Sequence, residues 1–266
     1  MFTHTYAREL AADAGRARTA LLAALPGLDG CTIVDEGEPI VVRRAGGERG
    51  RRFALTARLT PDAGVLRMAI HGGGESHGEF AAEIAAALPE GILADQGLPA
   101  ALAAMARPEL VLGGFELRHL ANELIPGERV LLMASCHVRR NLSLAVLTDR
   151  RLLVKDRKLL RSGTREVVLA KITSLTTLTR ISGDMVAVTA PNVTLRMKGM
   201  HPGRGKTFAD LLRTRIDAAA APAAEAGAPA GAGEVRALAA LRERGLLTDA
   251  EFTVAKHRAL GLGGTG

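Results

Sequence analysis

Aromatic residues are scarce in this chain of 266 residues, which has no tryptophan, one tyrosine and six phenylalanines. Sites that stack nucleic-acid bases, and cages that enclose cationic ligands, are built from such side chains. The scarcity therefore counts against both kinds of binding site. An apolar fraction of 47% and a charged fraction of 24% are ordinary for a folded protein and exclude a collagen or a wholly disordered chain.

Cysteine and long apolar runs are also lacking. Two thiols, Cys31 and Cys136, are too few for a disulfide framework, so we expect a reducing compartment. No stretch of transmembrane length is free of charge, and residues 1–18 have charged side chains where a signal peptide has an apolar core. We therefore expect a cytoplasmic protein, with peripheral contact to a membrane left open.

Positive charge is concentrated in the middle of the chain. Residues 1–110 have 11 basic and 14 acidic side chains, a net charge of −3. Residues 111–217 have 19 and 9, a net charge of +10, and residues 218–266 are neutral with 5 of each. The overall charge of +7 therefore comes from one segment, which suits a partner with an anionic surface.

Residues 1–110 predict a small α+β domain of unknown family. Apolar residues at helical spacing indicate a helix over residues 5–25, which Pro26 and Gly27 end. A second helix follows Ser76, which is placed to form a capping box with Glu79. The strands expected between these helices are residues 31–34, 39–43, 52–59 and 65–70.

Residues 111–217 predict an antiparallel β-barrel or sandwich closed by a helix. A short helix is expected over residues 116–124 and a longer one over residues 207–216. Between them, turn residues separate strand-like runs at regular spacing. The seven expected strands are residues 129–137, 142–147, 151–155, 165–169, 172–179, 185–189 and 193–198.

This segment resembles the bacterial pleckstrin-homology-like (PH-like) domains. Residues 128–132 and 144–154 read ERVLL and LAVLTDRRLLV, similar to the first strands and the hairpin of that family, and residues 172–174 match a later strand. The resemblance extends over about residues 116–216. It implies a seven-stranded curved sheet closed at one end by the C-terminal helix, in which we expect Phe208 to replace the tryptophan of many relatives.

Residues 218–233 contain only alanine, glycine, proline and Glu225. Such a stretch cannot form a packed apolar face, and its prolines and glycines interrupt a helix. We therefore expect a flexible linker here, with an alanine-rich helix as the alternative.

The tail, residues 234–261, is expected to form a helical hairpin. Over residues 234–260 it resembles the SHOCT family of short C-terminal domains, through the GLLT sequence at residues 245–248 and the Glu251-Phe252 pair that follows. Thr248 and Glu251 also make a capping box. Such a hairpin is too small to bury its own core, so we expect it to pair with another copy or to dock on a partner. The candidate self-association residues are Leu238, Leu241, Leu246, Leu247 and Phe252.

Motifs typical of enzymes are present only in incomplete form. Residues 71–74 match an oxyanion loop and residues 74–78 match G-x-S-x-G, so the two motifs share Gly74. In a hydrolase these motifs come from different strands, so the overlap counts against a hydrolase. Residues 203–207 read GRGKT, but Met200 stands where a P-loop requires its first glycine. The seven histidines show no ligand spacing, and adjacent Cys136 and His137 would point to opposite faces of a strand.

The sequence thus predicts an α+β, non-enzymatic binding and oligomerisation protein without catalytic, cofactor or metal sites. Its partners would be a protein or a second copy, through the C-terminal hairpin, with nucleic acid and small-molecule substrates not expected. One alternative is a peripheral membrane adaptor that binds anionic lipid through the basic domain. Another is an enzyme within residues 1–110, for which His71, Glu75, Ser76 and His77 would have to converge. The candidate anion- or lipid-binding residues are Arg139, Arg140, Arg150, Arg151 and Lys206, with Arg157, Lys158 and Arg161 nearby in sequence.

Overall fold

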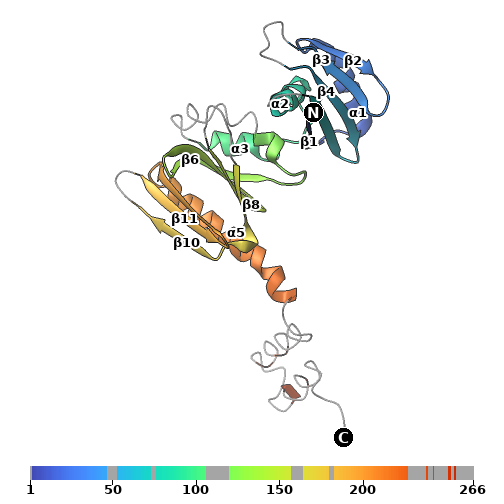
Figure 1. Ribbon diagram of the computed structural model, residues 1–266. Helices are drawn as coiled ribbons and strands as arrows, with labels where there is room; N and C mark the ends of the chain where they lie inside the picture. The colour runs from blue at the N-terminus through green and yellow to red at the C-terminus, as the bar shows by residue number, and fades with distance from the viewer. Residues whose placement is uncertain are drawn as a thin grey trace. The chain divides into compact units, whose positions relative to one another are not determined.

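The computed structural model describes residues 2–46, 53–72, 76–105, 120–156, 164–179 and 183–226, together with residues 238, 242, 251, 252 and 255 of the tail. The chain divides into two compact units, Met1–Asp210 and Leu211–Gly266. The first unit contains two antiparallel sheets, which occupy successive parts of the chain (Figure 1).

The N-terminal sheet has five strands in the order β1-β5-β4-β3-β2. Every second residue of its central strands is buried, as the two-residue period of a strand with one covered face requires. Two helices and a 3-10 turn supply the other half of this core, including Leu21, Phe80 and Ile84. The elements are β1 (Phe2–Glu9), α1 (Ala14–Ala24), η1 (Leu25–Gly27), β2 (Cys31–Asp35), β3 (Ile40–Arg44), β4 (Leu55–Asp62), β5 (Val65–Gly72) and α2 (His77–Ala87).

The helix predicted over residues 5–25 is wrong at its start, because β1 occupies Phe2–Glu9. This strand pairs along its whole length with β5, Tyr6 lying opposite Met68. Threonines and an aromatic residue favour a strand here, and tertiary pairing decides the outcome. Helix α1 begins only after Asp13, whose carboxylate accepts a hydrogen bond from the Arg16 N–H at 2.9 Å.

The capping box predicted at the start of α2 is also wrong. Ser76 occupies the N-cap position, but its side chain makes no capping hydrogen bond and its backbone is not extended (φ −83°, ψ 8°). A side-chain cap requires an extended N-cap residue. The helix is therefore held by packing, because Phe80 and Ile84 on its inner face are buried.

The second sheet has seven strands in the order β10-β11-β12-β6-β7-β8-β9. All seven strands predicted in this segment are confirmed within a few residues at their ends, and the antiparallel arrangement is confirmed with them. The strands are β6 (Val130–Val138), β7 (Asn141–Thr148), β8 (Arg151–Asp156), β9 (Thr164–Val168), β10 (Ser174–Leu178), β11 (Asp184–Ala190) and β12 (Val193–Met200), with a 3-10 turn η2 (Leu169–Lys171) after β9.

Two short helical pieces precede the second sheet and pack against it. They are α3 (Leu98–Ala103) and residues 120–123; the predicted residues 116–119 lie outside the described residues. Ala101, Leu120 and Leu124 share one core with residues of β6, β7 and β8. Helix α3 thus precedes the boundary predicted after residue 110 but packs on strands that follow it.

Helix α5 (Arg204–Ala226) is longer than predicted. We predicted that it ends at residue 216 and that a flexible linker begins at residue 218; residues 218–226 are helical instead. Alanine has the highest helix propensity of all residues, and here it outweighs the cost of one internal proline, Pro222. The rest of the predicted linker, residues 227–233, lies outside the described residues.

Phe208, in the first turns of α5, is completely buried, as expected for the residue that replaces the missing tryptophan. Among the described residues, no helix is both long enough and apolar enough to cross a membrane.

Candidate functional site

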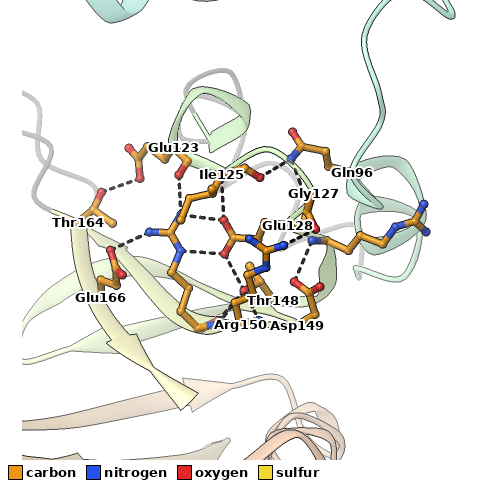
Figure 2. A network of polar contacts seen from close by, with 12 residues as sticks. Gln96, Glu123, Ile125, Gly127, Glu128, Thr148, Asp149, Arg150, Thr164 and Glu166 are labelled. Carbon is orange, nitrogen blue, oxygen red and sulfur yellow. Dashed lines mark hydrogen bonds and ion pairs between the residues drawn. The ribbon is translucent and has the colours of Figure 1, made fainter. Parts of the chain in front are cut away.

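The turn between β7 and β8 is held by the polar residues of the TDRR sequence (Figure 2). The Thr148 hydroxyl accepts hydrogen bonds from the backbone N–H groups of Arg150 (3.1 Å) and Arg151 (2.9 Å). The Asp149 carboxylate accepts one from the Arg129 N–H at 3.0 Å, just before β6. Threonine and aspartate thus close the turn and tie it to the neighbouring strand, as expected from their turn chemistry.

Glu128 lies at the centre of this network and is completely buried (Figure 2). Its Oε1 accepts hydrogen bonds from Arg151 Nε and from the Thr148 hydroxyl, both at 2.8 Å. Its Oε2 accepts from Arg151 Nη2 at 2.7 Å and from the Ile125 N–H at 2.8 Å. The carboxylate and the guanidinium therefore meet through two parallel bonds, the strongest geometry available to this pair.

Both members of the pair stay charged at neutral pH. Burial raises the pKa of the Glu128 carboxyl, but the hydrogen bonds from Arg151, Ile125 and Thr148 outweigh it and the net shift is downward. The hydrogen bond to Glu128 raises the pKa of Arg151 above its ordinary value, against the opposing effect of burial. Removing one partner would leave an uncompensated buried charge, so the pair locks the β7–β8 hairpin to the segment before β6.

Two glutamates extend the network to β9 and to the helical turn before β6. Arg151 Nη1 pairs with the Glu166 carboxylate, and its Nη2 donates to the Glu123 carbonyl, both at 2.7 Å. The Glu123 carboxylate in turn pairs with Lys155 and accepts a hydrogen bond from the Thr164 hydroxyl at 2.9 Å. The charged residues of β8 are thereby used to join neighbouring elements.

The segment before α3 reaches the same network through Gln96. Its buried amide donates to the carbonyls of Ile125 (2.9 Å) and Glu128 (3.1 Å). The next residue, Gly97, has a φ of +78°, and a Cβ there would lie 2.5 Å from the Val130 carbonyl oxygen. Only glycine permits this close approach, which seats α3 against β6.

Arg151 was predicted to bind anions, and this prediction is wrong. Its side chain is 8% exposed, and its nitrogens are held by Glu128, Glu166 and the Glu123 carbonyl. Arg150 is exposed but donates to the Gly127 carbonyl at 3.2 Å. The guanidinium of Arg151 is therefore taken up within the domain, whereas Arg150 keeps exposed donors.

The candidate arginines do not share one edge of the second sheet. Arg139 and Arg140 precede β7, whereas Arg150 follows it and Arg151 begins β8, so the two pairs lie at opposite ends of an eight-residue strand. At about 3.3 Å per residue they are separated by about 25 Å. The strand predicted over residues 142–147 already separates the two pairs, because the turns before and after one strand lie at its opposite ends.

Arg139 and Arg140 do form an exposed basic tip on the β6–β7 hairpin. Both side chains are exposed, and Arg139 adopts a left-handed backbone (φ +59°) that closes the two-residue turn. The register places Lys198 of β12 opposite His137 of β6, just behind this tip, and both of these residues are exposed. Sequence reasoning missed Lys198 and His137, because the pairing of the last strand with the first joins residues far apart in the chain. Arg157, Lys158 and Arg161 lie outside the described residues.

Lys206 was predicted to bind an anion at the start of α5, but the helix start is already occupied. The buried Asp184 carboxylate accepts a hydrogen bond from the Gly205 N–H at 3.1 Å, in the place where a P-loop holds phosphate. Lys206 itself is exposed and pairs with Asp210 one turn later, at 2.8 Å. The GRGKT sequence is explained by packing, since a Cβ at Gly205 would lie 2.3 Å from that of Asp184.

Among the described residues, no side-chain hydrogen bond joins His71, Ser76 and His77, the candidates for a hydrolase. His71 accepts or donates a hydrogen bond with the Thr3 hydroxyl at 2.7 Å, whereas His77 is buried and Ser76 makes no capping bond. Glu75 lies outside the described residues. One pair of histidines does lie close together, because the rings of His4 and His77 are 4.6 Å apart. No group of metal-binding side chains occurs in the described part of the chain.

Two of the five self-association candidates fall on described positions. Leu238 and Phe252 are helical and half-buried, and the guanidinium of Arg242 lies 5.3 Å from the centre of the Phe252 ring. Leu241, Leu246 and Leu247 lie outside the described residues.

Seven antiparallel strands followed by a helix that buries an aromatic residue define a PH-like domain in the centre of this chain. Residues 124–214 match a family described as the bacterial PH domain, which confirms that part of the expected resemblance. The match starts at the helical turn before β6 and ends within α5. Comparison with curated proteins finds none that matches the chain. A PH-like domain indicates a binding or adaptor role.

Proposed function

We propose that this protein is a cytoplasmic, non-enzymatic adaptor that self-associates, or docks on a partner protein, through its C-terminal segment. The PH-like domain is its binding platform. The observation that supports this most directly is that Glu128 and Arg151 are buried against each other, so these two charged residues hold the domain together instead of facing a partner. This buried pair fixes the hairpin within the PH-like domain. Partners would therefore bind to the exposed hairpin tips of that domain and to the C-terminal segment.

The C-terminal segment supports self-association through its apolar residues. Leu238 and Phe252 are helical and only half-buried. The contact between Arg242 and Phe252 joins the two parts of the segment that resemble the two helices of SHOCT domains. A pair of such short helices needs a second copy or a partner to complete its core.

Light scattering on the full chain and on a chain ending at Ala226 tests this proposal. Ending the chain there keeps the whole of α5. We expect the full chain to have a mass that is a multiple of 27.8 kDa and the shortened chain to be a monomer. Monomeric masses for both, together with failure of the isolated tail to capture the full chain, would contradict the proposal.

Binding of anionic lipid is a second candidate, favoured by the exposed tip at Arg139 and Arg140 with Lys198 and His137 behind it. Juxtaposed basic side chains at one end of a sheet can approach an anionic membrane together, each contributing about 1 kcal/mol. Sedimentation with vesicles containing phosphatidylserine tests this candidate. We expect binding that weakens with salt and is lost in R139E/R140E. Equal binding by that variant and by the unchanged protein would exclude it.

A further inference from the structure

Three arginines are buried among the described residues, and one of them lacks an acidic partner. Arg151 pairs with Glu128 in the second sheet, and Arg44 pairs with Glu83 of α2. Arg8 of β1 is also buried, with 8% of its surface exposed. In the described ranges it takes part in no ion pair and no side-chain hydrogen bond, and its Nε is cut off from solvent without a partner. A buried charge needs a partner, so Arg8 requires an explanation.

No acidic side chain of the described residues compensates Arg8. It lies opposite the buried Leu66 of β5 and therefore on the inner face of the N-terminal sheet. Side chains alternate between the two faces of a strand, so the adjacent Glu9 lies on the outer face, where its carboxylate accepts a hydrogen bond from the Gly127 N–H at 2.8 Å. Burial lowers the pKa of Arg8, and no neighbouring charge opposes this effect. An arginine stays protonated in proteins, so the positive charge remains.

Arg8 belongs to a row of three polar side chains on the inner face of β1. Residues two apart on a strand share a face, so His4, Tyr6 and Arg8 follow one another at intervals of about 6.6 Å. His4 is exposed, Tyr6 is half-buried and Arg8 is buried, so exposure falls along the row. The ring of His4 lies 4.6 Å from that of His77, at the start of α2, and the buried Nε2 of His77 also has no partner. The row therefore runs from solvent to an uncompensated guanidinium.

The same row lies at an edge of the sheet. Strand β1 is the first in the strand order and pairs with β5 on one side only. Its other side is bonded just past Arg8, where the Ala94 N–H donates to the Glu9 carbonyl at 2.9 Å and the Ala11 N–H donates to the Ile92 carbonyl at 3.0 Å. No strand in the described part of the chain pairs with the rest of this side. A ligand can therefore approach Arg8 from the edge, past Tyr6.

We propose that Arg8 and Tyr6 form a binding site for an oxyanion, a single carboxylate or phosphate group. A guanidinium offers two parallel N–H donors, which match the paired oxygens of either group. The Tyr6 hydroxyl has no hydrogen-bond partner among the described residues, and burial raises the pKa of this phenol, so it is a donor at neutral pH. A bound anion supplies both the charge that Arg8 lacks and an acceptor for Tyr6.

Tyrosine fluorescence reports on this site alone, because Tyr6 is the one tyrosine of a chain without tryptophan. The experiment titrates the full chain with sodium phosphate and, separately, with sodium acetate, at an ionic strength held constant with sodium chloride. The variants are R8M, which has a similar volume and no charge, and R8Q, which keeps a polar group. The matched control is R43M, which removes an exposed arginine from the outer face of the same sheet. Circular dichroism confirms that each variant is folded.

We expect a saturable change in Tyr6 emission for the unchanged chain and for R43M, with half-saturating concentrations within about twofold of each other. R8M and R8Q should raise that concentration by at least about tenfold, because the paired donors are lost. Collisional quenching by the anions does not saturate, so it is separated from binding.

Saturation by phosphate alone, by acetate alone or by both supports the site and identifies the group that it takes. The proposal is overturned if neither anion gives a saturable change with the unchanged chain, or if R8M and R8Q saturate as the unchanged chain does. None of these results depends on the C-terminal segment or on lipid, so the proposed function is tested separately.

Discussion

At the scale of single residues, the charged side chains of the PH-like domain divide by burial into two groups with different roles. Glu128 and Arg151 are buried and satisfy each other, whereas Arg139 and Arg140 are exposed at a hairpin tip. The sequence presents all four as polar residues near turns. Arg151 pairs with Glu128, which lies 23 residues earlier in the chain. Only this three-dimensional contact shows that Glu128 and Arg151 are structural, whereas Arg139 and Arg140 are available for binding.

Replacing Glu128 by glutamine should destabilise the fold strongly, because the buried Arg151 guanidinium loses its compensating charge. We expect a loss of about 3–5 kcal/mol in the free energy of unfolding, measured by urea titration. The double variant E128Q/R151M should recover part of that loss. As a control, D62N removes an exposed ion pair and should cost less than about 1 kcal/mol. An E128Q protein as stable as the D62N protein would contradict the assigned role.

The contribution of Glu128 should also depend on pH. Its pKa is lower in the folded protein than in the unfolded chain, so its stabilisation is complete above the unfolded-state pKa of about 4.3 and is lost as pH falls through the folded-state pKa. We expect the difference in unfolding free energy between the unchanged protein and E128Q to be constant from pH 7 to pH 6. It should shrink between about pH 5 and pH 3. A difference that stays constant to pH 3 would show that the carboxylate charge is not what stabilises the fold.

Cys136 should be unreactive in the folded protein. Burial raises the pKa of its thiol to about 12, and the side chain is 1% exposed, so almost no thiolate is present or accessible at neutral pH. In a C31S variant, a thiol-specific disulfide reagent should therefore give no reaction with the native protein and complete reaction in urea. Rapid labelling of the native variant would indicate that β6 opens readily.

At the scale of elements, alternation and turn chemistry predicted the seven strands of the PH-like domain well, because each strand is short, apolar and bounded by turn residues. The errors occur where a local signal competes with tertiary structure. Residues 5–9 have helical spacing but pair with β5, and the alanines after residue 217 extend α5 beyond its predicted end. Strand order could not be predicted, so the pairing of β12 with β6, which places Lys198 opposite His137, could not be foreseen.

The start of α5 gives a test at this scale. A methyl group at Gly205 would meet Asp184 Cβ at 2.3 Å, so G205A must displace the helix from β11. We expect a loss of about 1–3 kcal/mol in the free energy of unfolding. The control is G27A, at a glycine with no atom within 4 Å of the added methyl group, which should be nearly neutral. Equal stabilities for the two variants would show that Asp184 does not cap α5 in the way described.

At the scale of the whole molecule, segment charges describe the surface poorly. The segment with a net charge of −3 buries Arg8 and Arg44, and the segment with +10 uses Arg151 and Lys155 internally. A net charge therefore does not predict the charge of a particular face. The PH-like part of the candidate site was predictable from the TDRR hairpin. The position of Lys198 beside His137 was not, because it depends on the pairing of β12 with β6.

If the tail assembles the protein through its apolar residues, sedimentation equilibrium of the full-length L238E/F252E variant shows it most directly. The matched control is R139E/R140E, which also changes two residues but leaves the tail intact. We expect the unchanged chain and the control to associate with rising concentration, while L238E/F252E keeps the mass of one chain, 27.8 kDa. Two results would contradict assembly through the tail. One is that L238E/F252E associates as strongly as the unchanged chain, and the other is that the unchanged chain is a monomer that binds no partner through its tail.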